Sequence, residues 1–131
     1  MNPQDFAIAQ RREGKSAAAA AAALKQTYNV SAQEAAKLLK GAGYAATEVG
    51  AALKAVYGLT AQAVAQVLNG VQYTADQVAT TMKTVFNLTA EQTQAVLNAA
   101  GYATDQVANA LKSVFDWVKK NPLAPLDPRN W

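Results

Sequence analysis

The fold is decided by residues 86–114, which read FNLTAEQTQAVLNAAGYATDQVANALKSV. This stretch contains two short helical patterns, each preceded by an aromatic residue and by residues suited to a helix N-terminus. The same pattern occurs one 29-residue step earlier, at 57–85, and again at 28–56. Self-similarity at a fixed period of this length indicates a repeat protein.

Each repeat is predicted to contain a first helix, helix A, and a second, helix B. Serine or threonine accepts a hydrogen bond from a free N–H group in the first turn of a helix, and helix A is expected to start at Ser31, Thr60 and Thr89. A Glu or Gln three residues after the cap predicts capping boxes at Ser31–Glu34, Thr74–Gln77 and Thr89–Gln92. The A helices are expected to end in left-handed glycines, at Gly41 and Gly43, Gly70 and Gly101.

The two ends of the chain depart from the repeat. Residues 1–14 are predicted to be a degraded helix A, opened by Asn2-Pro3 and stopped by Gly14. Ser16 is expected to cap an alanine-rich helix B that carries little charge. The last helix B is predicted to run from Thr104 to about Lys120, and residues 121–131, with three prolines, are predicted to be extended.

The predicted fold is all-α: an α-solenoid of about four 29-residue two-helix repeats, with seven to eight short helices and an extended Pro-rich C-terminal tail. A single repeat domain would span residues 1–120, with repeats at about 1–27, 28–56, 57–85 and 86–114, and the tail would span 121–131. Short helices are marginal alone in water, so each must bury its apolar face on its neighbours. Two core ladders are expected, one of Leu39, Leu68 and Leu97 and one of Leu24, Leu53, Met82 and Leu111.

The amino-acid composition excludes several kinds of catalytic and metal-binding site. The 131 residues include no Cys and no His, which excludes thiol nucleophiles, thiolate metal sites and an imidazole base. No nucleophile–base pair stands at a recognisable spacing, so we expect a non-enzyme with no cofactor, metal or small-molecule substrate. No apolar run reaches the roughly 18 residues of a membrane span. The opening residues do not resemble a secretion signal, and the sequence leaves the compartment open, since a leader removed earlier would not be visible.

One lysine recurs in all four B helices, and these residues form the lysine ladder: Lys25, Lys54, Lys83 and Lys112. The ladder is predicted to lie opposite the core. It would serve either as an anion-binding stripe, for example for a nucleic-acid backbone, or as a solvated face that keeps the stack soluble. Asp76 and Asp105 precede two of the lysines on the same face, which favours the second interpretation.

Aromatic residues recur at two positions, as Tyr28, Tyr57, Phe86 and Phe115 and as Tyr44, Tyr73 and Tyr102. Such rings can stack on bases or sugars. We favour a packing role, in which each ring fixes a helix against the next repeat, because Tyr and Phe replace each other at one position.

Units of the form aromatic-x-x-Thr-Ala-x-x-Val-Ala-x-x-Leu, which extend over residues 15–114, resemble the repeats of bacterial α-solenoid proteins. The segment Leu88–Gly101 is also similar to the first helix of a TAL-effector DNA-binding repeat, a family in which each repeat reads one base. The 29-residue unit lacks the proline that follows Leu-Thr in that family and the variable pair before the glycines. No base-reading residue is therefore carried over.

These features predict a structural or interaction protein that assembles head to tail with itself into a filament or ring. The charged fraction of 16% is below the roughly 25% of typical soluble proteins, which suggests that some surface is covered in the working state. The tail residues Leu123, Leu126 and Trp131 are candidates for docking on a neighbouring subunit or partner. The alternatives are a polyanion- or nucleic-acid-binding module that uses the lysine ladder, and a scaffold for another protein.

Overall fold

The computed structural model describes residues 2–116, and within this range the chain is all-helical, with eight helices and no strand. The helices are α1 (Pro3–Arg12), α2 (Ala17–Tyr28), α3 (Ala32–Ala42), α4 (Ala46–Tyr57), α5 (Ala61–Gly70), α6 (Ala75–Val85), α7 (Ala90–Ala99) and α8 (Thr104–Phe115). The odd-numbered helices are the A helices and the even-numbered helices are the B helices.

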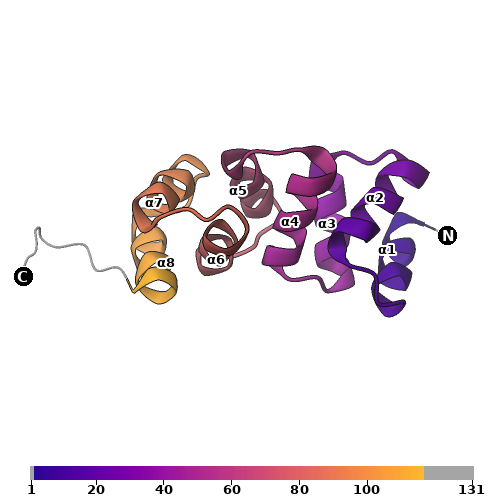
Figure 1. The fold of residues 1–131 in the computed structure, drawn as a ribbon, viewed down its shortest axis with the longest axis horizontal. Coiled ribbons are helices and arrows are strands. Elements are labelled where there is room, and N and C mark those ends of the chain that lie inside the picture. Colours follow the sequence, from indigo (N-terminus) through magenta and orange to yellow (C-terminus); the bar gives the residue numbers. More distant parts are fainter. Residues whose placement is uncertain (1, 117–131) are drawn as a thin grey trace, which may run out of the picture.

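The helices form two rows that follow the long axis of the molecule (Figure 1). Each helix packs against its neighbours in sequence and against the equivalent helix of the adjacent repeat, and the B helices make the closest row. The pair α1 and α2 lies at one end of the stack, and the pair α7 and α8 lies at the other (Figure 1). The predicted all-α repeat fold is therefore confirmed.

Most helix starts follow the sequence prediction. Ser31 and Thr60 accept hydrogen bonds from the N–H groups three residues later, as do Asn2 and Ser16 in the first repeat. The capping boxes at Thr74–Gln77 and Thr89–Gln92 are complete. At Ser31 only half of the predicted box forms, because the side-chain oxygen accepts from the Glu34 N–H without a return bond in the described residues.

Two predicted helix ends are wrong, and Gly41, which was also expected to be left-handed, lies inside α3. Gly70 is the last residue of α5, and the left-handed residue is Gln72, with φ 71°, two positions later. It is the repeat equivalent of Gly43 and Gly101, which both have φ 101°. The last helix B does not reach Lys120: α8 ends at Phe115, because Asp116 adopts the left-handed conformation, with φ 54°.

Both predicted ladders lie in the core, together with buried valines and alanines. Leu39, Leu68 and Leu97 are fully buried in the A row, and Leu24, Leu53, Met82 and Leu111 are fully buried in the B row. Small residues let the B helices approach each other, and Gly50 is the smallest of them. A Cβ at Gly50 would overlap the Thr81 side chain of the next B helix. Close contact between small residues therefore joins successive repeats along the B row.

Candidate functional site

The candidate site is the set of contacts that joins each repeat to the next, together with the two end faces where this set is incomplete. On the B row the lysine ladder makes the most regular of these contacts. The Nζ atoms of Lys25, Lys54 and Lys83 donate to the carbonyl oxygens of Val56, Val85 and Val114, at 3.4, 3.3 and 3.0 Å. Each lysine thus reaches the last turn of the next B helix, where free carbonyl groups attract a cation.

The same lysines lie over the aromatic residues at the ends of the next B helices. Lys25 Nζ is 5.0 Å from the centre of the Tyr57 ring, Lys54 Nζ is 5.1 Å from that of Phe86, and Lys83 Nζ is 5.5 Å from that of Phe115. These distances are typical of cation–π contacts. The contact needs only the ring, which explains why Tyr and Phe replace each other there. The lysines remain exposed to solvent, yet three of the four are engaged between repeats.

A second ladder of contacts is made by tyrosine hydroxyl groups. Tyr102 donates to the carbonyl oxygen of Tyr73, Tyr73 donates to that of Tyr44, and Tyr44 donates to that of Lys15, at 2.7 to 2.8 Å. Burial raises the pKa of Tyr73 to about 12 and that of Tyr102 to about 12. The protonated hydroxyl is the form that can donate each of these bonds. The first repeat has Lys15 where the others have tyrosine.

Side chains of the A helices also donate hydrogen bonds from one repeat to the next. Gln4 Nε2 donates to Leu38 O at 3.1 Å, and Gln62 Nε2 donates to Val96 O at 3.4 Å. The equivalent residue between them, Gln33, lies against Gly70, where a Cβ would come within 2.9 Å of its Nε2. A glutamine of one repeat therefore lies on the last turns of the next A helix at each junction.

One more donor position lies near the end of each A helix. Lys40 Nζ donates to Val71 O and Gln72 O at 2.8 and 3.2 Å, and Asn69 Nδ2 donates to Ala100 O at 2.8 Å. In the first repeat this position holds Arg11, whose guanidinium group lies 5.8 Å from the centre of the Tyr44 ring. Each junction is therefore crossed by donors from both rows.

Within residues 2–116, both end faces carry members of this set that have no partner in a neighbouring repeat. At the α7–α8 end, Lys112 and Asn98 have no hydrogen-bond partner among residues 2–116, because their acceptors would belong to a fifth repeat. At the α1–α2 end, Arg12, Glu13 and Lys15 are exposed. The N-terminal end is therefore more charged than the alanine-rich α2 suggested. The tail residues Leu123, Leu126 and Trp131 lie outside the described residues.

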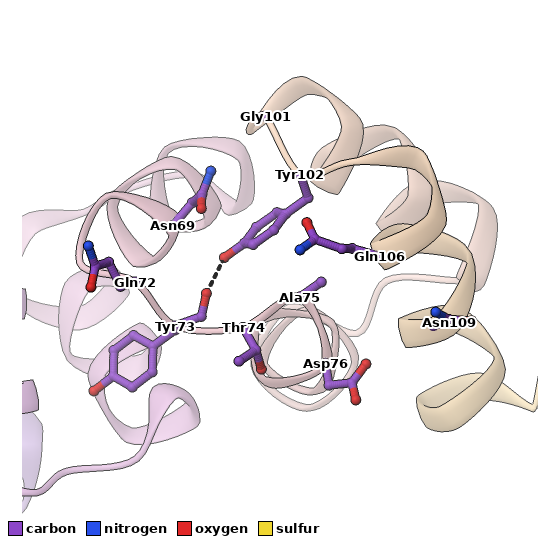
Figure 2. A pocket seen from close by; sticks show the side chains of 10 residues that line it. All are labelled: Asn69, Gln72, Tyr73, Thr74, Ala75, Asp76, Gly101, Tyr102, Gln106 and Asn109. Atoms are coloured by element: carbon purple, nitrogen blue, oxygen red, sulfur yellow. Dashed lines mark hydrogen bonds between the residues drawn. The ribbon is translucent and has the colours of Figure 1, made fainter.

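An open groove of about 450 Å³ lies between the last two repeats. Figure 2 shows the Tyr102 ring in this groove between Asn69 and Gln106, with its hydroxyl group bonded to the Tyr73 carbonyl. A smaller hollow of about 190 Å³ lies one repeat earlier. Each residue that lines it, Gln77 and Thr80 among them, is 29 positions before a residue that lines the larger groove. The groove is therefore a product of repeat geometry, and Gln77 and Gln106 use their side-chain oxygens to cap their own helices.

The described residues contain no group of three side chains that could hold a metal ion. None of the helices in residues 2–116 is long and apolar enough to cross a membrane. Comparison with protein-family models found no match, and comparisons with curated proteins and with solved structures found none either. The resemblance to bacterial α-solenoid and TAL-effector repeats stays a prediction.

Proposed function

We propose that the protein is a non-enzymatic structural repeat protein whose copies join head to tail, with the α7–α8 end of one copy on the α1–α2 end of the next. The observation that carries the proposal is the regular junction between repeats. Donors cross each of the three internal junctions, with lysine and amide groups donating to the next repeat and tyrosine hydroxyl groups donating to the preceding one, and members of the same set without a partner among residues 2–116 remain at both ends. A second copy placed in the same register continues an interface that the chain already uses three times.

The B row supports this register. Lys112 is equivalent to Lys25, Lys54 and Lys83, and the next copy offers the carbonyl oxygen of Thr27, which is the equivalent of Val56, Val85 and Val114. Each such contact is exposed and weak alone, on the order of 0.5–1 kcal/mol. The junction would therefore rely on several contacts and on apolar burial together.

Apolar surface is available at the same place. Ala108 is exposed, whereas its equivalents Ala21, Gly50 and Ala79 are buried by the next B helix. The residue of a second copy that would cover it is Ala23, the equivalent of Ala52 and Ala110. At two of the three internal junctions, these two positions are likewise both occupied by alanine. The two ends are thus compatible in size as well as in hydrogen bonding.

Opposite ends of one molecule would meet in this contact, so the assembly is heterologous and gives a filament or a ring. The lysine ladder supports this proposal better than the alternative polyanion stripe, because three of its lysines already bind carbonyl groups and rings of the next repeat. A scaffold that binds another protein would use the sides of the stack and would need no contact between its ends.

Sedimentation velocity over a concentration series, followed by electron microscopy of the same samples, tests the proposal. We expect species larger than the 13.8 kDa monomer that grow with concentration, and particles that are linear or ring-shaped. Lys112→Gln should shift the assembly to higher concentration. A single monomeric species throughout the micromolar range would overturn the proposal.

A further inference from the structure

The two end faces differ from the internal junctions at one pair of positions in the A row. At the internal junctions a glutamine lies against a small residue near the end of the next A helix: Gln4 against Gly41 and Gln33 against Gly70. The third junction has Gln62 and Ala99 at these two positions. At the ends of the stack the glutamine position holds Glu91, and the small-residue position holds Arg12.

We propose that Glu91 of one copy forms an ion pair with Arg12 of the next, and that this pair makes the end-to-end contact specific for a second copy of this chain. The inference rests on the head-to-tail assembly proposed above and names the residues that decide it. Both side chains are exposed, and neither has an ion-pair partner among residues 2–116.

The position of Arg12 agrees with this role. A Cβ at Gly41 would meet the end of the Gln4 side chain, so this position of an A helix faces the glutamine position of the preceding repeat. Arg12 is the last residue of α1, and it lines an open hollow on the outer side of that helix together with Asp5, Ile8, Ala9 and Glu13. This open hollow leaves space for a carboxylate from a second copy.

The change from Gln to Glu fits the same explanation. A glutamine at this position donates its amide N–H to a backbone carbonyl, as Gln4 and Gln62 do. A carboxylate only accepts hydrogen bonds, so Glu91 cannot repeat that contact. It needs a donor or a cation in the next A helix, and arginine supplies both in a planar group that matches a carboxylate.

Neighbouring positions are compatible with the pair. Glu13 follows Arg12, and the register places its backbone carbonyl opposite the Asn98 amide, as Asn69 meets Ala100 O. Lys15 replaces the tyrosine that donates to the preceding repeat, and its ammonium group can donate to Tyr102 O instead. The substitutions that distinguish the first repeat therefore still offer partners to the last repeat.

A simpler explanation is that Glu91 and Arg12 only stabilise the helices in which they lie. Glu91 lies in the first turn of α7 and Arg12 in the last turn of α1, where each charge is favourable toward the helix dipole. Charge reversal separates the two explanations. Glu91→Arg places arginine on both end faces, and Arg12→Glu places glutamate on both, so each variant alone would oppose like charges in its own junction.

The test measures assembly of the full chain by sedimentation velocity for each variant, for an equimolar mixture of the two variants, and for the double variant E91R/R12E. We expect each single variant to need at least about tenfold more protein than the wild type to assemble, since like charges at a contact are strongly unfavourable. The mixture should assemble again, with the two variants alternating, and the double variant should assemble like the wild type.

Matched controls are Glu34→Arg and Lys37→Glu, which reverse exposed charges on α3 away from both ends and should assemble like the wild type. Single variants that assemble normally would overturn the ion pair while leaving head-to-tail assembly intact. Impaired variants that a mixture does not restore would assign the charges to their own helices and would also overturn it. A monomeric wild-type protein would instead reject the assembly itself, and the ion pair with it.

Discussion

The methyl group of Thr81 fills the space into which a side chain on Gly50 would project. Both residues are buried in the contact between α4 and α6, and Thr81 Oγ1 donates to Gln77 O within its own helix at 2.9 Å. The equivalent positions hold Ala21 with Ala52 at the preceding junction and Ala79 with Ala110 at the following one. At the α4–α6 contact, Thr81 therefore carries an additional methyl group where Gly50 lacks one, whereas the other two junctions pair alanine with alanine.

Gly50→Ala is therefore expected to destabilise the protein, although alanine is favoured over glycine inside a helix by about 1 kcal/mol. Overpacking typically costs about 1–3 kcal/mol, and the atoms that would overlap belong to a side chain confined between two helices. Urea unfolding at a concentration where the protein is monomeric measures the effect. Adding Thr81→Ala should restore the stability lost by Gly50→Ala, since it recreates the alanine pair of the other junctions. Two effects that simply add would show that these residues do not compete for one space.

Replacing Gln72 by glycine should stabilise the fold by about 1 kcal/mol. Gln72 has φ 71°, and a non-glycine residue in the left-handed region carries a cost of roughly 1–2 kcal/mol. The contact that Gln72 accepts from Lys40 uses its backbone carbonyl, which glycine retains. The reverse change at the equivalent position, Gly43→Gln, should destabilise by a similar amount in the same urea titration. A loss of stability in Gln72→Gly would mean that its side chain is needed in the groove.

Thr93→Val should also raise the stability, by about 1 kcal/mol. Thr93 is fully buried in α7, and its hydroxyl group has no hydrogen-bond partner in the described part of the chain. A buried hydroxyl group without a hydrogen-bond partner lowers the stability by about 1–3 kcal/mol, and valine has the same shape without the hydroxyl. The equivalent residue of the preceding repeat is Val64. Thr81→Val serves as the control, because it removes the bond to Gln77 O and is expected to lose about 0.5 kcal/mol.

Mutations in the lysine ladder are expected to have two different effects on monomer stability. Lys54→Gln and Lys83→Gln remove contacts between repeats and are each expected to lower monomer stability by about 0.5–1 kcal/mol. Lys112 has no such contact within residues 2–116, so Lys112→Gln should leave monomer stability unchanged. Chemical denaturation of dilute protein separates the three variants. Equal, negligible effects would favour the alternative of a free cationic stripe, which a salt-sensitive interaction with a polyanion would then support.

Alkaline pH should loosen the junctions between repeats. Burial raises the pKa of Tyr73 to about 12 and that of Tyr102 to about 12, from the ordinary value of 10.0. Because the folded-state pKa values are raised, the stability from these groups is fully present below pH ~10 and is lost as the pH rises toward about 12. Absorbance at the phenolate band should show tyrosines that titrate late and together with unfolding. Tyr73→Phe should reduce this alkaline sensitivity, since phenylalanine has no hydroxyl group to ionise.

Sequence alone determined the repeat length, the helix type and most helix starts. These features depend on local chemistry: Ser31 and Thr60 offer an oxygen to the first turn, and a fixed period places leucines such as Leu39 and Leu68 in one row. The ends of α5 and α8 were not predictable in the same way. Gln72 adopts the left-handed conformation although its side chain does not favour it, and Asp116, of a type that tolerates this conformation, adopts it after Phe115.

Tertiary structure decided what the repeated polar residues do. In the sequence, Lys54 is one of a row of charges, and nothing local indicates that it contacts Val85 O and Phe86 at the end of the next B helix. The tyrosine hydroxyl bonds were missed for the same reason, although the exclusive use of Tyr at 44, 73 and 102 was a usable signal. A period in sequence fixes which residues are equivalent, but only the stacking of the helices fixes which residues meet, because the contacts join atoms about one repeat apart.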